Sequence, residues 1–303
     1  MTKLIMMVGL VGSGKSTYAE KLALQENAII HSSDKLREEM FGSVDENSKN
    51  DELFITLHRR IKNDLIEGKN VIFDATNISY KRRMAFLNEL KKIDCTKICY
   101  MIATTYEKCL EQNKNRERKV PEHVIKKMYL NFDVPAYFEG WDQIAIISDD
   151  KSESHEDLFT RLDTINQDNP HHIFTIGMHC KSTAAHLCND IINGVAYNDI
   201  NLITAALYHD IGKEFTKSFE NSKREVTDIA HYYQHHHVSA YSVIFLLFSK
   251  SVTDILDVCQ LIRWHMQPFF MDSDKARDKF IKLVGQEFYD RLMMLHEADR
   301  KAH

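Results

Sequence analysis

Short apolar runs alternate with longer amphipathic segments along the first half of the chain. The short runs have the length of buried strands, and the longer segments repeat their apolar residues at helical spacing. Strands and helices that alternate in this way predict an α/β domain, with a parallel sheet covered by helices on both faces. The predicted strands are 3–8, 28–31, 70–73, 96–102 and 143–147, and the predicted helices are 15–24, 34–40, 51–67, 81–92 and 106–113.

The pattern changes in the second half. An acidic, apolar-poor stretch, SDDKSESHED, begins at Ser148, and beyond Pro170 the apolar residues recur at helical spacing only, which predicts an all-α domain. A chain of 303 residues is long enough for two domains. We expect an α/β domain in residues 1–150, a linker region in residues 151–170 and an all-α domain in residues 171–303.

Composition narrows the class of protein. Hydrophobic residues make up 44% of the chain and charged residues 27%, as in ordinary globular proteins. The formal net charge is −5, which argues against a protein that binds nucleic acid through a generally cationic surface. A phosphate backbone would have to meet local basic clusters, and the candidates are 81–83 (KRR) and 114–119 (KNRERK).

Cysteine usage and the apolar start bear on location. The six cysteines form no CxxC pair and no disulfide-framework spacing, which is typical of reduced thiols in a cytoplasmic protein. The apolar run 4–11 is too short to span a membrane and leads into a glycine-rich loop. We therefore expect a buried strand there and no membrane association.

A phosphate-binding loop follows the first predicted strand. Residues 9–16 read GLVGSGKS, which matches G-x-x-x-x-G-K-S/T, and they open a predicted helix. The glycines allow backbone N–H groups to surround phosphate oxygens at the helix N-terminus. We expect Lys15 to reach the β- and γ-phosphates of ATP and Ser16 to help hold Mg²⁺. The residues predicted to bind the nucleotide are Gly9, Gly12, Ser13, Gly14, Lys15, Ser16 and Thr17.

The acceptor should lie beyond the ends of the neighbouring strands, where open parallel sheets bind ligands. Asp34 and Arg37 follow the second strand, and Asp74 follows the third. A carboxylate placed there can act as general base on an attacking hydroxyl, and an arginine can orient an acceptor phosphate. The alternative role for Asp34 is in a helix N-cap with Ser32 or Ser33. Basic residues in 113–121 can close over the γ-phosphate.

Histidine and aspartate carry the chemistry of the second half. His209 and Asp210 stand side by side at the end of a predicted helix, and Lys213 follows three residues later. Imidazole and carboxylate together suit divalent ions such as Fe²⁺, Mn²⁺, Mg²⁺, Co²⁺ or Ni²⁺. Facing helices can project such ligands into a common core. The other candidate ligands are His179, His235 or its neighbour His236, His265 and Asp299.

The first half resembles the kinase domain of the 5′-hydroxyl polynucleotide kinases of phage and bacterial RNA-repair systems. The resemblance rests on GLVGSGKST, SSDKLRE, FDATNISYKRR and NKNRERKVP, in that order within residues 9–121. It implies that Asp34 is the general base, that Arg37 binds the acceptor phosphate and that Asp74 is a second essential aspartate. It also implies that Arg116 is the lid arginine, with Arg118 as the alternative. Small-molecule kinases share the loop and a D-x-x-R element.

The second half resembles the HD-domain phosphohydrolases, whose signature is the series H…HD…H…H…D. The ligands that the resemblance implies for a first metal ion are His179, His209, Asp210 and Asp299. Asp210 would bridge to a second ion, and His235 and His265 would complete that site. The resemblance also implies that Lys213 contacts the scissile phosphate. His172 is a further candidate for a phosphate contact.

Together the two resemblances imply a bifunctional enzyme that heals nucleic-acid ends. The kinase would transfer phosphate from ATP to a 5′-hydroxyl, and the HD half would remove a 3′-phosphate or open and clear a 2′,3′-cyclic phosphate. RNA ends are expected ahead of DNA ends, with a ligase as partner, and the oligomeric state stays open. The alternative is a small-molecule or nucleoside kinase joined to an HD nucleotide phosphohydrolase. A nucleotide-sensing module with an inactive HD half is disfavoured by Asp210, Lys213 and Asp299.

Overall fold

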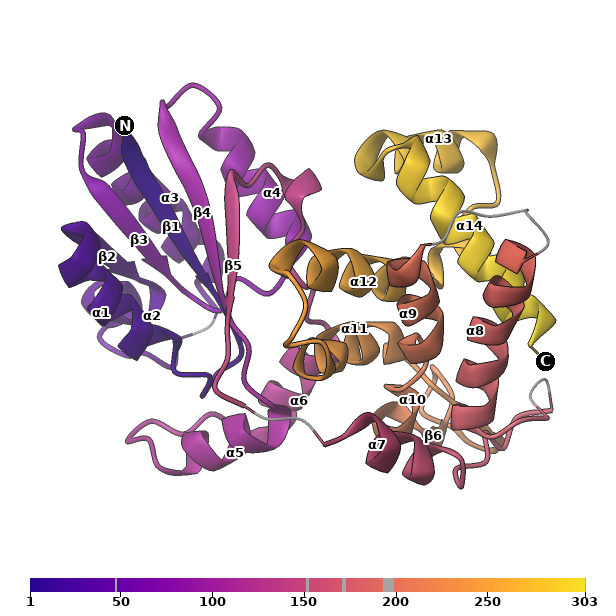
Figure 1. The fold of residues 1–303 in the computed structure, drawn as a ribbon. Helices are drawn as coiled ribbons and strands as arrows, with labels where there is room; N and C mark the ends of the chain where they lie inside the picture. The colour runs from indigo at the N-terminus through magenta and orange to yellow at the C-terminus, as the bar shows by residue number, and fades with distance from the viewer. Residues whose placement is uncertain (47, 151–152, 171–172, 193–198, 303) are drawn as a thin grey trace. The chain divides into compact units, whose positions relative to one another are not determined.

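The computed structural model describes residues 1–46, 48–150, 153–170, 173–192 and 199–302 (Figure 1). The chain divides into two compact units. The first consists of Met1–Met128 and Pro135–Asp150, and the second of Tyr129–Val134 and Lys151–His303. His172, a candidate phosphate contact, lies outside the described residues.

A five-stranded sheet with the order β2-β3-β1-β4-β5 forms the centre of the first unit. All four neighbouring pairs of strands are parallel. This arrangement confirms the α/β fold that the alternating pattern predicts. The strands are β1 Thr2–Val8, β2 Ala28–Ser32, β3 Asn70–Asp74, β4 Cys95–Ile102 and β5 Gln143–Ile147.

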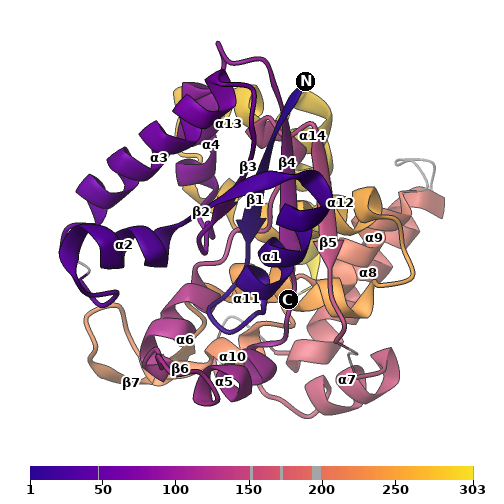
Figure 2. The same ribbon diagram turned by 90° about the vertical axis from the view of Figure 1, so that its left-hand side faces the viewer.

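Helices cover both faces of this sheet (Figure 2). Successive side chains of a strand point to opposite faces, and the neighbours of two consecutive β3 residues show what lies on each. Ile72 packs in one cluster with Leu22 of α1, whereas the ring of Phe73 contacts Phe86 of α4. The helices of the first half are α1 Lys15–Glu26, α2 Ser33–Phe41, α3 Asn50–Ile66, α4 Tyr80–Glu89, α5 Tyr106–Lys114 and α6 Glu122–Leu130, with the 3-10 turn η1 Tyr137–Glu139.

The register of the strands brings three connections to one edge of the sheet. Asp74, the last residue of β3, pairs with Met7 of β1 on one side and with Ser32 of β2 on the other. The loop after β1, the start of α2 and the segment after β3 therefore leave the sheet at the same edge. Ligands of open parallel sheets bind at this edge.

The second unit is mainly helical, which confirms the predicted fold class. A hairpin of two short strands, which the hydrophobic pattern does not predict, interrupts the helices. Most residues of these strands are exposed or half-exposed, so they lack the apolar alternation that identifies a strand. The elements are α7 His155–Leu162, α8 Ile176–Ile192, α9 Ile200–Tyr208, α10 Lys213–Thr216, β6 Ser218–Glu220, β7 Val226–His231, α11 His235–Leu246, α12 Val252–Trp264, η2 Gln267–Phe270, α13 Asp274–Val284 and α14 Gln286–Lys301.

The stretch between the two predicted domains contains a packed helix. In α7 the side chains of Leu158, Phe159 and Leu162 are buried. A hydrophobic face of this kind belongs to the core of a unit rather than to a solvated tether. Within the described ranges, no helix combines the length and the apolar character that crossing a bilayer requires.

Candidate active sites

The glycine-rich loop after β1 has the backbone that its sequence requires. Gly12 and Gly14 adopt left-handed conformations, with φ of 82° and 84°. A Cβ on Gly12 would lie 2.4 Å from the carbonyl oxygen of Cys109, so no other residue fits without displacing the backbone of α5. Gly14 also caps α1, and the loop therefore ends on a helix N-terminus, where anions bind.

Ser16 and Asp74 form the polar centre beside this loop. The Ser16 hydroxyl donates a hydrogen bond to Asp74 Oδ2 at 2.8 Å. Asp74 is buried, and its Oδ1 has no hydrogen-bond partner among the residues that the structure describes. A hydroxyl and a carboxylate with a spare oxygen are the ligands that Mg²⁺ prefers. The Lys15 ammonium donates to the carbonyl of Leu10 at 3.3 Å, and burial lowers its pKa despite the nearby carboxylates.

Asp34 projects from the first turn of α2 at the same edge of the sheet. Its side chain is 48% exposed, so a substrate hydroxyl can reach it. The cap of α2 is Ser32, whose side chain accepts from the backbone N–H of Lys35, and this leaves the Asp34 carboxylate free of a capping role. Arg37 Nη1 donates to Asp34 Oδ1 at 3.1 Å, and Arg118 Nη1 lies 3.4 Å from Oδ2.

The three arginines that follow the strands of this sheet differ in solvent exposure and in their hydrogen-bond partners. Arg37 is buried and also donates to Asn50 Oδ1 at 2.8 Å, so in this structure it positions Asp34, and its Nε has no hydrogen-bond partner among the residues that the structure describes. Arg118 is held by Asp45 and by the carbonyl of Val44, both at 2.8 Å. Arg116 is exposed, and its charge contributes, after burial, to the lowered pKa of Lys15.

The basic cluster 81–83 is not a uniform surface. Arg83 is 1% exposed, and its guanidinium makes two hydrogen bonds to the buried Glu139 carboxylate, at 2.6 and 2.7 Å. Arg83 also donates to the carbonyl of Asn77. The reading of this cluster as a nucleic-acid contact is therefore wrong for Arg83, while Lys81 and Arg82 are exposed.

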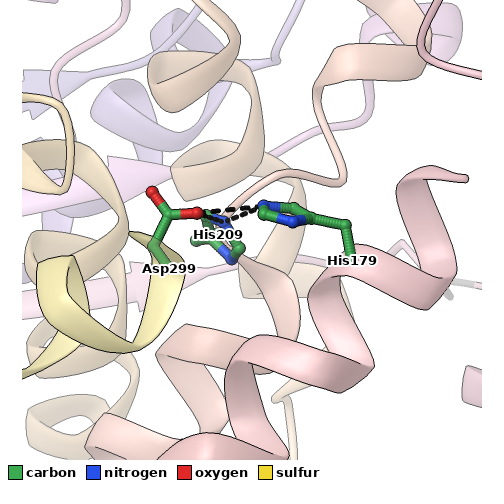
Figure 3. Close-up of side chains that lie close together, drawn as sticks. All are labelled: His179, His209 and Asp299. Atoms are coloured by element: carbon green, nitrogen blue, oxygen red, sulfur yellow. Dashed lines mark hydrogen bonds and ion pairs between the residues drawn. The ribbon is translucent and has the colours of Figure 1, made fainter. Parts of the chain in front are cut away.

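Three helical segments bring the first group of predicted metal ligands together in the second unit (Figure 3). His179 projects from α8, His209 directly follows α9, and Asp299 projects from α14. Asp299 Oδ1 lies 3.0 Å from His179 Nε2 and 3.4 Å from His209 Nε2. All three side chains are buried, and their ligand atoms lie close enough to hold one ion.

The second group is formed by Asp210, His235 and His265. Asp210 Oδ1 lies 3.2 Å from His235 Nε2 and 3.6 Å from His265 Nε2. The other oxygen, Oδ2, lies 3.2 Å from His179 Nε2, so the carboxylate of Asp210 stands between the two groups. Of the two histidines that the sequence left open, the structure brings His235 to Asp210, and His236 belongs to neither group.

The orientation of the four rings fits a cation. Each Nδ1 faces a backbone carbonyl, which can only accept, so each Nδ1 carries the proton. These carbonyls belong to Ala302, Ala206, Tyr232 and Ile262 for His179, His209, His235 and His265 in turn, at 2.7 to 3.1 Å. The Nε2 lone pairs then converge in two pairs, 3.3 and 3.1 Å apart. Such an arrangement of imidazole nitrogens and carboxylates is the donor set that divalent transition metals bind.

Packing fixes the turn that carries His209 and Asp210. Gly212 donates its backbone N–H to Ser239 Oγ of α11 at 2.8 Å. A Cβ at this position would lie 2.5 Å from the carbonyl oxygen of His235. Glycine therefore lets the turn approach the start of α11, and this approach sets the distance between Asp210 and His235.

Lys213 is oriented by Gln167, a residue outside every motif of the sequence. Its ammonium lies 2.7 Å from Asp210 Oδ2 and donates to Gln167 Oε1 at 2.8 Å. Gln167 is itself buried and anchored, because its Nε2 donates to the carbonyl of Phe174 and its own carbonyl accepts from the hydroxyl of Tyr232. No motif marks Gln167, and only its contact with Lys213 identifies it.

Comparison with protein families separates the two halves. Residues 4–135 match the AAA domain family, and residues 178–302 match the HD domain family. The chain joins a P-loop kinase domain to an HD domain. The kinase domain implies ATP and Mg²⁺ as cofactors, and the HD domain implies divalent metal ions.

Relatives match the kinase half. The L-seryl-tRNA(Sec) kinase of Methanococcus maripaludis is 31% identical over 144 residues, which cover 46% of this chain and 56% of the relative. This chain thus matches little more than half the length of that relative. A chain of the Pnkp1/Rnl/Hen1 RNA repair complex is similar with a TM-score of 0.36 and 23% identity, over 42% of each chain. A gluconokinase from Sinorhizobium meliloti has a TM-score of 0.37 and 13% identity, over 50% of this chain and 84% of that one.

Proposed function

We propose that this enzyme transfers phosphate from ATP to a 5′-hydroxyl at a nucleic-acid end and removes phosphate from the other end. Residues 1–150 would act as the kinase and residues 171–303 as a 3′-phosphatase or cyclic phosphodiesterase, with RNA ends as the favoured substrate. The observation that carries the kinase part is the half-exposed carboxylate of Asp34. It lies at the end of the sheet at which the phosphate-binding loop also lies. A carboxylate there is placed to act on an acceptor outside the nucleotide site.

In the proposed kinase step, the acceptor hydroxyl oxygen attacks the γ-phosphorus and ADP leaves. Asp34 takes the proton of the hydroxyl, while Arg37 holds the carboxylate in place. Lys15 and Arg116 stabilise the charge that develops on the γ-phosphoryl oxygens. Mg²⁺, held by Ser16 and Asp74, would supply neutralisation of the phosphate charge.

A polynucleotide acceptor is supported by charge near the site. Lys114 at the end of α5 is exposed, as are Arg116 and Lys119 in the segment that follows, and cations placed in this way suit a phosphodiester strand. The identity of the M. maripaludis relative, a kinase named for seryl-tRNA, is also compatible with an acceptor hydroxyl carried on RNA. That relative favours a second candidate acceptor, a hydroxyl on a group attached to tRNA.

In the proposed hydrolase, the two metal groups share Asp210, and Lys213 binds the phosphate next to it. Bound divalent ions would supply Lewis-acid polarisation of a phosphoryl oxygen. The buried ammonium of Lys213, held by Asp210 and Gln167, would orient the substrate. We infer Mn²⁺, Fe²⁺, Co²⁺ or Ni²⁺ as the metals because the donor set is rich in imidazole.

The test uses γ-labelled ATP with Mg²⁺ and a short 5′-hydroxyl RNA, alongside a 3′-phosphorylated RNA in a metal-loaded reaction. Asp34→Asn should reduce label transfer by about 10²- to 10⁴-fold, the usual contribution of a general base, and should leave 3′-phosphate removal intact. Asp45→Asn is the matched control, because Asp45 also contacts Arg118 but lies outside the proposed chemistry. It should transfer label at close to the wild-type rate.

Asp210→Asn should show the reverse pattern, with 3′-phosphate removal lost and label transfer kept. Equal loss of transfer in Asp34→Asn and Asp45→Asn would reject the general-base role. Transfer to a free nucleoside or to seryl-tRNA, with none to any 5′-hydroxyl strand, would reject the polynucleotide end as acceptor.

A further inference from the structure

A cavity of about 570 Å³ opens onto the second metal group of the HD domain. Asp210, Lys213 and His235 line it, and so do the aromatic side chains of Tyr233, Phe269 and Phe270. Its volume falls in the range of small-molecule sites. The cavity therefore has room for more of a substrate than the phosphate group.

The aromatic wall is unusually exposed. Tyr233 is 49% exposed, Phe269 50% and Phe270 68%. Large apolar side chains that remain in contact with water beside a polar centre mark a place where a ligand covers them. Neighbouring rings support two of the three: Tyr233 stacks on His231 with an interplanar angle of 7°, and Phe269 packs edge-on against His296.

The charges that line the cavity limit what else it can bind. Lys213 is the only lysine or arginine among the described lining residues. A nucleoside triphosphate or a bisphosphate would bring several negative charges, and one ammonium beside the metal groups offers a place for a single phosphate. Beyond that phosphate, the cavity presents the rings of Tyr233, Phe269 and Phe270 alongside uncharged polar side chains such as Asn169 and Gln234.

We propose that Tyr233, Phe269 and Phe270 form a stacking platform for the base of a nucleotide whose single phosphate lies at Lys213. The inference rests on the proposed hydrolase function and specifies its substrate class. The site takes nucleoside monophosphates, including the 3′-terminal nucleotide of a strand, in preference to sugar phosphates and triphosphates. Because every base has an aromatic face, the platform is tolerant of base identity.

Binding tests the platform directly. The probe is uridine 3′-monophosphate, titrated calorimetrically into metal-free protein that carries Lys15→Met, so that the kinase site does not contribute. Phe270→Leu keeps apolar bulk and removes the ring. It should weaken the affinity for uridine 3′-monophosphate by about 5- to 30-fold, the contribution of one base stacked on one ring. Ribose 5-phosphate should bind equally to both proteins, and Phe270→Tyr should restore the affinity for the nucleotide.

The stacking platform is rejected if Phe270→Leu binds uridine 3′-monophosphate as tightly as its parent does. It is also rejected if the affinity for ribose 5-phosphate falls by the same factor as the affinity for the nucleotide. Glycerol 2-phosphate hydrolysis by the Mn²⁺-loaded enzyme separates this result from the hydrolase proposal. If the enzyme hydrolyses neither uridine 3′-monophosphate nor glycerol 2-phosphate, but nucleotide binding still depends on the Phe270 ring, the platform is retained and the hydrolase is rejected. If it hydrolyses both esters equally and Phe270→Leu has no effect, the hydrolase is retained and the platform is rejected.

Discussion

The Nε2 atoms of His235 and His265 lie 3.1 Å apart, although His235 is the first residue of α11 and His265 directly follows α12. Each ring donates its Nδ1 proton to a carbonyl of the preceding turn, from Tyr232 and Ile262. Two imidazole nitrogens therefore face each other in a buried site, 3.1 Å apart and beside the Asp210 carboxylate. A cation bound between them and Asp210 would be coordinated by all three side chains, so metal should stabilise the fold.

We expect a divalent transition metal to raise the thermal midpoint of the HD unit. At a concentration of 100 times the dissociation constant, binding contributes about 2.7 kcal/mol to the free energy of unfolding, which corresponds to a shift of several degrees. The measurement is thermal unfolding with Mn²⁺, Co²⁺ or Ni²⁺ and with EDTA. His235→Ala should lose most of the shift.

His236→Ala is the matched control for this experiment. His236 stands next to the proposed ligand and belongs to neither metal group, so its removal should leave the metal-dependent shift in place. A shift that disappears in His236→Ala and persists in His235→Ala would reverse the assignment. No shift with any of the metals would contradict the metal site itself.

Local sequence was sufficient to predict features that depend on neighbours in the chain. The strand, loop and helix around Lys15 follow from a contiguous pattern, and so does the placement of Asp74 at the end of β3. Features set by distant partners were not predictable. Arg83 looks like part of a basic run until Glu139, 56 residues later, buries it. Gln167 lies in a stretch expected to be a linker, and its role depends on Lys213, 46 residues away.

Gln167 should act as a positioning residue for Lys213. Gln167→Leu removes the oxygen that accepts from the Lys213 ammonium, and a hydrogen bond to a charged group contributes about 1.5–3 kcal/mol. We expect phosphatase kcat/KM to fall by at least about tenfold, while 5′-kinase activity is unchanged. Both activities can be measured on the same preparation.

Gln167→Glu provides the test of mechanism, because it keeps an oxygen facing Lys213. It should recover part of the phosphatase activity that Gln167→Leu loses. If both variants lose the same activity together with thermal stability, Gln167 has a purely structural role. Unchanged phosphatase activity in Gln167→Leu would show that Asp210 alone orients Lys213.

The segment Tyr129–Val134 should stabilise the HD unit although it precedes the kinase's last strand. Asp133 Oδ1 accepts from Arg263 Nε at 2.8 Å, and the carbonyl of Val134 accepts from Gln260 at 2.9 Å. Both partners lie on α12, and His265 directly follows this helix. Asp133→Ala leaves the half-buried Arg263 without this carboxylate, and we expect a loss of about 1–3 kcal/mol.

Hydrogen–deuterium exchange locates this effect, since it reports opening of individual helices. Asp133→Ala should accelerate exchange in α12 and weaken metal binding, because His265 at the end of α12 would be less well fixed. Asp272→Ala, an exposed aspartate of the same unit, should leave both unchanged. A fragment that starts at residue 151 lacks the whole segment and should exchange faster still. If α12 exchanges in that fragment at the same rate as in the full chain, Tyr129–Val134 packs on the HD unit without stabilising it.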